Sequence, residues 1–222
     1  MKICVFGDSI GKGIIFDAVS KRYKSLKLDL LEPLRQYKDV SVKNYSMFGC
    51  TINRGLALIE RYADELAGYD HILLEFGGND CNFPWKEIAE APEKEHLPNN
   101  SLEIFTNVYK ECVERIQKAG AKPILLTLPP LDAKRFFPWV SQGLSACIIQ
   151  NWLGDIEAIY RWQEMYSIAV LKLGKMLNVP VIDIRSEFLC GQNLLELICM
   201  DGMHPTSKGY ELIVKAVCEQ LA

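Results

Sequence analysis

Short apolar runs, rich in β-branched and aromatic residues, recur along the 222-residue chain. They lie at residues 3–6, 40–45, 69–76, 122–128 and 179–184. Most are continuous, although the second alternates in part, and each ends near Gly, Pro, Ser or Asp. Strands of a parallel sheet have this character because both of their faces are buried. The pattern therefore predicts five buried strands.

Segments with the period of an amphipathic helix lie between and after these runs. Residues 52–67, 102–119, 156–177 and 207–221 carry apolar side chains three to four positions apart. Gly120 follows the second segment, as expected of a helix C-terminus. Alternating strands and helices predict an α/β fold, a parallel sheet covered by helices on both faces in three α/β/α layers. No internal repeat or linker interrupts the pattern, so we expect a single domain over residues 1–222.

Two segments depart from this alternation. Residues 82–100 contain three prolines and mixed charges, and residues 129–160 contain several aromatic side chains. Both follow predicted strand ends, where open α/β sheets bind their ligands. They are candidate lids or pocket walls, and packing of their aromatic rings against the body of the protein is an equal alternative.

Composition and charge exclude several classes of protein. The chain is 49% apolar with a net charge of -3, and this balance does not predict a nucleic-acid partner. No apolar stretch is long enough to span a bilayer, and the N-terminus lacks the cleavage region of a signal peptide. We therefore expect a cytoplasmic protein. Its eight cysteines are scattered, and no C-x-x-C pair or zinc spacing occurs. We expect reduced thiols, most of them in the core, and neither a metal nor a cofactor.

The first apolar run leads into Val5–Gly13, "VFGDSIGKG", where we expect a strand to turn into a helix. A P-loop needs a glycine at position 6 and a hydroxyl residue at position 13, but Phe6 and Gly13 stand there. A dinucleotide fingerprint fails at its third glycine, which is Phe16. The motif therefore favours a turn that presents Ser9 as a nucleophile over a phosphate-binding loop.

A serine nucleophile needs a base, usually a histidine oriented by a carboxylate, and hydrogen-bond donors for the oxyanion. Asn79 offers an amide just past the third predicted strand, and Gly49 follows the second, where it allows close approach of a backbone N–H. Asp201 and His204 are three residues apart, near a glycine and a proline that oppose regular helix. A tight loop can bring the carboxylate to imidazole Nδ1 and leave Nε2 for Ser9.

Four blocks of residues carry a resemblance to a known family. They are Gly7–Ser9, Gly49, Gly77–Asp80 as G-x-N-D, and Asp201–His204 as D-x-x-H. In this order, across nearly the whole chain, they resemble the blocks of the SGNH hydrolases, also called GDSL-type esterases and lipases. Ile10 stands where many members have leucine, an apolar exchange that leaves the chemistry unaffected.

The resemblance implies a flavodoxin-like sheet with strand order 2-1-3-4-5. It implies Ser9 as nucleophile, His204 as general base and then acid, and Asp201 as the residue that orients His204. It also implies an oxyanion hole made of the backbone N–H groups of Ser9 and Gly49 and the side chain of Asn79. On this interpretation, the activity needs neither a cofactor nor a metal.

Alternatives remain for several of these side chains. Asp183 ends the fifth predicted strand and is the second candidate for the acid that orients His204. Asp8 and Asp80 are expected to serve the structure of their loops. Cys50 and Cys81 follow the second and third blocks, and they are more simply core or pocket residues than nucleophiles.

The sequence thus predicts a serine esterase that forms an acyl-enzyme from a small ester, with short-chain or carbohydrate esters favoured. A lysophospholipase, thioesterase or acyltransferase with the same triad is the nearest alternative. An alternative of another class is a non-catalytic flavodoxin-like module that binds a nucleotide or anion beside Gly11–Gly13, where Lys12 could attract the anion. The oligomeric state is not predicted.

Overall fold

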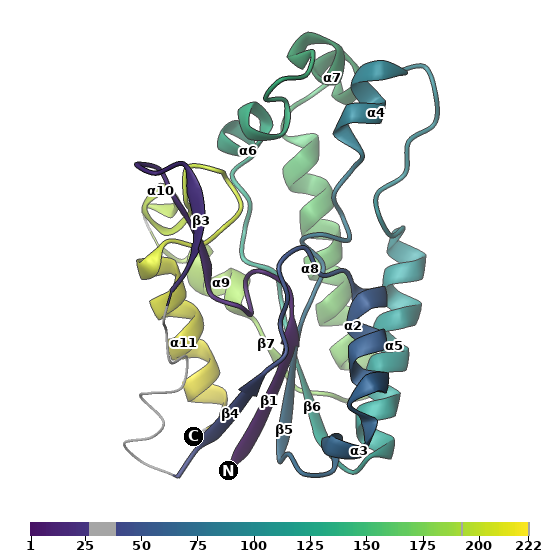
Figure 1. Ribbon diagram of the computed structural model, residues 1–222, viewed down its shortest axis with the longest axis vertical. Coiled ribbons are helices and arrows are strands. Elements are labelled where there is room, and N and C mark those ends of the chain that lie inside the picture. Colours follow the sequence, from purple (N-terminus) through teal and green to yellow (C-terminus); the bar gives the residue numbers. More distant parts are fainter. Residues whose placement is uncertain (27–38, 192, 222) are drawn as a thin grey trace.

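Five parallel strands form the central sheet of the protein, in the order β4-β1-β5-β6-β7 (Figure 1). The computed structural model describes residues 1–26, 39–191 and 193–221. Numbered along the chain, the sheet order is 2-1-3-4-5, which confirms the expected flavodoxin-like topology. The strands are β1 (Lys2–Gly7), β4 (Ser41–Asn44), β5 (His71–Glu75), β6 (Lys122–Leu126) and β7 (Val181–Ile182).

Helices cover both faces of this sheet, so that successive residues of a strand enter different cores. In β1, Cys4 and Phe6 pack on one face, and Ile3 and Val5 pack on the other. The first face is covered by α2 (Ile52–Arg61), α3 (Ala63–Leu66), α5 (Leu102–Lys118) and α8 (Ala158–Leu177). The second is covered by α9 (Ile184–Leu189), α10 (Leu194–Leu197) and α11 (Ser207–Leu221).

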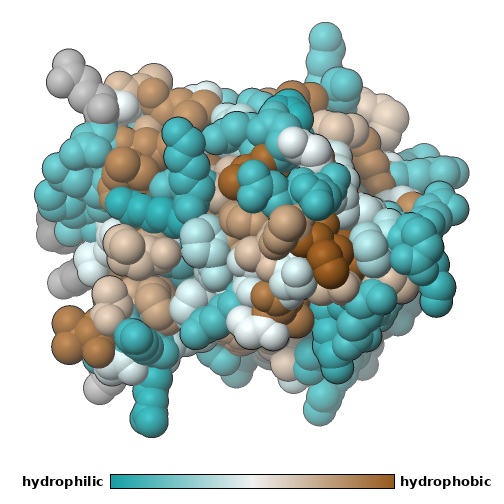
Figure 2. Space-filling model, turned by 90° about the horizontal axis from the view of Figure 1, so that it is seen from above, coloured by the Kyte–Doolittle hydropathy of each residue, from teal (hydrophilic) through white to brown (hydrophobic). Residues whose placement is uncertain are grey.

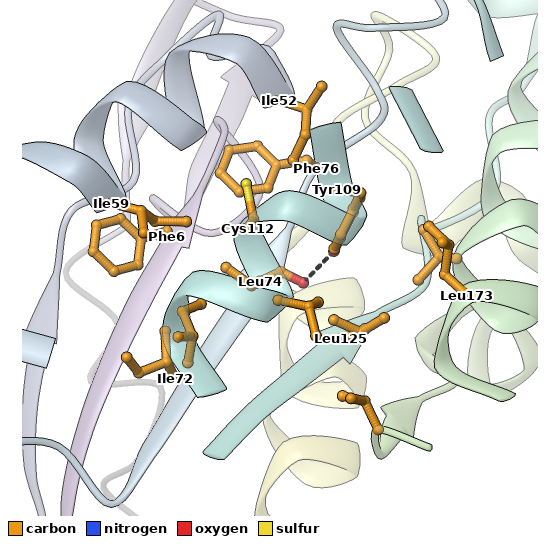
Figure 3. Close-up of a cluster of buried hydrophobic side chains, with 14 of the residues drawn as sticks. Phe6, Ile52, Ile59, Ile72, Leu74, Phe76, Tyr109, Cys112, Leu125 and Leu173 are labelled. Carbon is orange, nitrogen blue, oxygen red and sulfur yellow. Dashed lines mark hydrogen bonds between the residues drawn. The ribbon is translucent and has the colours of Figure 1, made fainter. Parts of the chain in front are cut away.

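The core on the first face is closely packed around fully buried aromatic side chains (Figure 3). Tyr109 of α5 is buried, and its hydroxyl donates a 2.9 Å hydrogen bond to the carbonyl of Leu74 in β5. Helix α2 approaches the sheet at Gly55, where an added Cβ would lie 2.4 Å from the ring of Phe76. Burial of a large apolar side chain contributes about 1.5–3 kcal/mol, so this layer holds the strands that carry the site.

The segment after Ser9 corrects one expectation, because a β-hairpin replaces the helix predicted there. A turn leads into β2 (Ile14–Asp17), which pairs in antiparallel fashion with β3 (Arg22–Ser25). Phe16 and Tyr23 face each other in this hairpin, and Lys21 adopts a φ of 51° at its tip. The β-branched and aromatic residues that follow Gly13 favour a strand over a helix.

Smaller differences concern the ends of elements. The helix predicted over 52–67 is divided into α2 and α3 at Tyr62. The fifth strand is only two residues long, because Asp183 caps α9 by accepting a 3.3 Å hydrogen bond from the N–H of Ser186. By contrast, α11 spans residues 207–221, as predicted.

The two segments outside the alternation, 82–100 and 129–160, lie beyond the carboxyl ends of the strands (Figure 1). They contain α4 (Trp85–Glu90), α6 (Ala133–Val140) and α7 (Ala146–Leu153). Figure 2 views the molecule from this end, where apolar residues are visible among hydrophilic ones. We call these two segments the cap. Aromatic side chains of the cap pack on each other and also line the pocket described below.

Candidate active site

Ser9, His204 and Asp201 form a continuous hydrogen-bonded relay, although the serine and the aspartate are 192 positions apart in the sequence. His204 Nε2 lies 2.9 Å from Ser9 Oγ, and His204 Nδ1 lies 2.6 Å from Asp201 Oδ2. His204 and Asp201 are almost completely buried, whereas Ser9 lines a pocket. This arrangement allows the imidazole to take the hydroxyl proton while the carboxylate fixes the ring and its tautomer.

The loop before α11 holds the carboxylate and the imidazole in register. Asp201 Oδ1 accepts hydrogen bonds from the backbone N–H groups of Met203 and His204, both at 3.2 Å. Gly202 has a φ of 77°, and an added Cβ would lie 2.4 Å from the backbone nitrogen of Phe136. Glycine is therefore needed here both for the backbone conformation and for the close contact with the cap.

The turn that follows β1 presents Ser9 to the pocket. The N–H of Ile14 donates to the carbonyl of Ser9 at 2.9 Å, and the N–H of Lys12 donates to that of Asp8 at 3.1 Å. Within residues 1–26, 39–191 and 193–221, the N–H of Ser9 donates to no protein acceptor, and neither does that of Gly49. Gly49 lines the same pocket with a φ of 69°. Two backbone donors are thus free beside the serine.

Asn79 lies in the same pocket but is not a free donor in this structure. Its Nδ2 donates to Asp8 Oδ2 at 2.9 Å and to the carbonyl of Cys50 at 3.2 Å. The structure thus brings together all five residues predicted for the site, with the Asn79 amide bonded to its neighbours.

A pocket of about 300 Å³ opens beside Ser9. Its walls are mainly apolar and aromatic. They come from β3, the loop that contains Phe48 and Gly49, the cap and α8. Polar groups in the wall include the amides of Asn82 and Gln163, and the latter donates to the carbonyl of Pro129 at 2.7 Å. The main apolar lining residues are Tyr23, Phe48, Phe83, Trp85, Phe136, Trp139 and Trp162.

Three of these aromatic residues pack at or beside His204, and two of them, Tyr23 and Phe48, lie outside the segments predicted as pocket walls. The ring of Tyr23 lies 5.0 Å from that of His204, and Phe48 stacks on His204 at 6.1 Å. Trp139 packs against Tyr23 at 6.0 Å. Burial and the nearby charge of Asp201 raise the pKa of Tyr23, so its hydroxyl stays neutral. Tyr23 was missed because the hairpin that carries it was predicted as a helix.

The alternative candidates lie in other roles. Asp183 accepts from the hydroxyls of Thr127 at 2.9 Å and Ser186 at 2.5 Å, and so belongs to the α9 cap. Burial raises the pKa of Cys50 to about 12 and also raises that of Cys81, which keeps both thiols protonated. Lys12 is exposed on the turn. The alternative of a nucleotide- or anion-binding module required a helix that begins beside Gly11–Gly13, and no helix begins there.

Fold and site together define an α/β protein with a flavodoxin-like sheet and a buried Ser-His-Asp relay. The sequence profile of the GDSL-like Lipase/Acylhydrolase family matches residues 5–212. The chain therefore belongs to this family, which is the one indicated by the four sequence blocks, and it is a hydrolase of ester bonds.

Solved structures show the same fold at low sequence identity. A lipase/acylhydrolase from Enterococcus faecalis is 21% identical, with a TM-score of 0.69 over 99% of this chain and 94% of that one. A catalytic mutant of an acetylxylan esterase from Geobacillus stearothermophilus is 16% identical, with a TM-score of 0.64 over 100% of this chain and 94% of that one. Among curated proteins, no sequence matches. In the described ranges, no helix is long and apolar enough to span a bilayer.

Proposed function

We propose that this protein is a serine esterase in which Ser9, His204 and Asp201 act as the catalytic triad. The observation that carries the proposal is the relay itself, with its 2.9 Å and 2.6 Å contacts at the wall of a pocket. In the acylation step, His204 Nε2 takes the Ser9 proton as Oγ attacks the ester carbonyl. The imidazolium then gives that proton to the leaving alcohol, and an acyl-enzyme remains. A water, deprotonated by His204, releases the acid and restores Ser9.

The oxyanion of each tetrahedral intermediate would be held by the N–H groups of Ser9 and Gly49 and by the amide of Asn79. The first two are supported by their lack of a protein acceptor in the described part of the chain. For Asn79, we infer that the N–H that donates to the Cys50 carbonyl donates to the oxyanion instead. This 3.2 Å bond is longer than the bond to Asp8. A negatively charged oxygen is the stronger acceptor of the two.

The pocket supports a preference for an apolar acyl group. Its aromatic walls would bury a chain or ring and release water, whereas an acetyl group would leave most of the roughly 300 Å³ unfilled. This favours the longer acyl chain over the short-chain or carbohydrate ester that the sequence favoured. Transfer of the acyl group to an alcohol would use the same triad.

The test compares hydrolysis of p-nitrophenyl acetate, butyrate and octanoate by the wild-type protein and by Ser9→Ala. We expect the activity to disappear in Ser9→Ala and the wild-type kcat/KM to rise from acetate to octanoate. Equal rates in the two proteins would refute Ser9 as nucleophile. A profile that favours acetate would refute the acyl-pocket assignment and leave the triad intact.

A further inference from the structure

Two buried carboxyl groups, those of Asp8 and Glu75, lie side by side at the wall of the pocket. Their residues are only 1% and 2% exposed. Gly7 pairs with Glu75 across β1 and β5, so the next residue, Asp8, sits at the same sheet edge. The N–H of Asp8 donates to the Glu75 carbonyl at 3.2 Å and to Glu75 Oε2 at 3.3 Å. The two carboxyl side chains are also neighbours, and a hydrogen bond between them would require a proton on one of the two.

The charges around this pair do not balance two ionised carboxylates. Nowhere in the described parts of the chain does a lysine or arginine form an ion pair with either group. Of the titratable groups nearby, His204 attracts Asp8 and Asp80 repels Glu75. The other neighbours are phenols and thiols that burial keeps neutral: Tyr109, Tyr210, Cys50 and Cys81. Burial also raises the pKa of both Asp8 and Glu75, so two unpaired negative charges there would be strongly unfavourable.

The pair contacts Asn79 of the proposed oxyanion hole and the turn that carries Ser9. Asp8 Oδ2 accepts from the Asn79 amide at 2.9 Å, and Asp8 Oδ1 accepts from the N–H of Ile10 at 2.8 Å. Glu75 Oε2 accepts from the N–H of Gly11 at 3.0 Å. The pair thus connects the turn that carries Ser9 to the side chain that would face the oxyanion.

We propose that Asp8 and Glu75 share one proton and, as a singly charged pair, act as positioning residues for Asn79 and for the Ser9 turn. One negative charge strengthens the hydrogen bonds that the pair accepts from Ile10, Gly11 and Asn79. Loss of the proton would set two buried charges against each other, and a second proton would weaken the bonds. The kinetic part of this proposal rests on the proposed function, whereas the shared proton does not.

The kinetic test uses Asp8→Asn, Glu75→Gln and, as a matched control, Glu114→Gln on the exposed face of α5. Rates are expressed per active site by titration with a fluorophosphonate, which removes differences in the folded fraction. Both Asp8 oxygens accept, so the amide introduced by Asp8→Asn must lose one of these bonds. The amide introduced by Glu75→Gln can still accept through its oxygen and donate to Asp8. We expect kcat to fall about tenfold or more in Asp8→Asn and less in Glu75→Gln, with KM nearly unchanged. A per-site kcat in Asp8→Asn equal to that of the control would overturn the positioning role.

The second test detects the proton directly and needs no activity. Infrared spectra of the wild-type protein at pH 8 should contain the C=O stretch of a protonated carboxyl group. We expect this band to be absent from Asp8→Asn and from Glu75→Gln and to persist in Glu114→Gln. If the wild-type protein lacks the band, or if both variants keep it, no proton is shared. If Ser9 is not labelled by the phosphonate, the proposed function fails, while the infrared result still decides the state of the pair.

Discussion

Replacement of Asp201 by asparagine separates the role of the carboxylate from that of the fold. Asp201 Oδ2 accepts from His204 Nδ1 at 2.6 Å, while Oδ1 accepts from two backbone N–H groups of the loop. In Asp201→Asn, the amide oxygen can keep the loop bonds, so the NH₂ group must face Nδ1. The imidazole then carries its proton on Nε2 and cannot accept one from Ser9.

The expected effect of this wrong tautomer is a loss of about 10⁴-fold in kcat, equivalent to about 5 kcal/mol of transition-state stabilisation. The assay is hydrolysis of p-nitrophenyl butyrate, with thermal unfolding measured in parallel. Asp183→Asn is the matched control, because Asp183 is the other candidate acid and caps α9. We expect Asp183→Asn to cost less than about 1 kcal/mol of stability, because asparagine caps a helix as well as aspartate does, and to leave the activity unchanged. A loss of less than tenfold in Asp201→Asn, or an equal loss in Asp183→Asn, would refute the assignment of Asp201.

Three further predictions concern the pocket, the backbone donors and a buried acid. Phe83→Ala removes a pocket ring whose centroid lies 4.3 Å from that of Trp162. It should lower kcat/KM about tenfold more for the octanoate ester than for the acetate ester. An equal loss for both esters would contradict the acyl pocket. Gly49→Ala should cost about 1–2 kcal/mol of stability and also lower kcat. The control is Gly120→Ala, because Gly120 has a similar φ of 86° and equally open space around an added Cβ. It should show the stability loss alone. Burial raises the pKa of Asp80 from 3.8 to about 6, so the folded state binds this proton more tightly than the unfolded state does. The free energy of unfolding should therefore fall by up to about 3 kcal/mol as the pH rises from about 4 to about 6. Denaturant unfolding between pH 4 and 6 should show a smaller fall in Asp80→Asn, and identical slopes would contradict this origin.

The sheet could be predicted from the sequence because each strand is a short apolar run and each crossover carries a helical period. The loop at Asp201–His204 could be predicted as well, since a three-residue spacing in a segment that opposes helix restricts the distance between the two side chains. These are local signals. They do not depend on how distant segments pack.

The hairpin after Ser9 and the aromatic contacts around His204 could not be predicted in the same way. Ile14–Asp17 pairs with Arg22–Ser25 and not with a strand of the central sheet. The glycines that precede it predicted a turn into a helix instead. The hairpin, the loop before Gly49 and the cap must pack together before their aromatic side chains meet. These side chains are Tyr23, Phe48 and Trp139. The Glu75 carboxyl was overlooked because it belongs to a strand that is otherwise apolar.

The central claim is that Ser9 becomes covalently acylated. The most direct measurement is mass spectrometry of the protein after reaction with a fluorophosphonate, with the modified peptide sequenced in the wild-type protein and in Ser9→Ala. The account predicts one adduct, on Ser9, that forms in the wild-type protein and not in the variant. An adduct on another residue, or ester hydrolysis that persists without any adduct on Ser9, would contradict it.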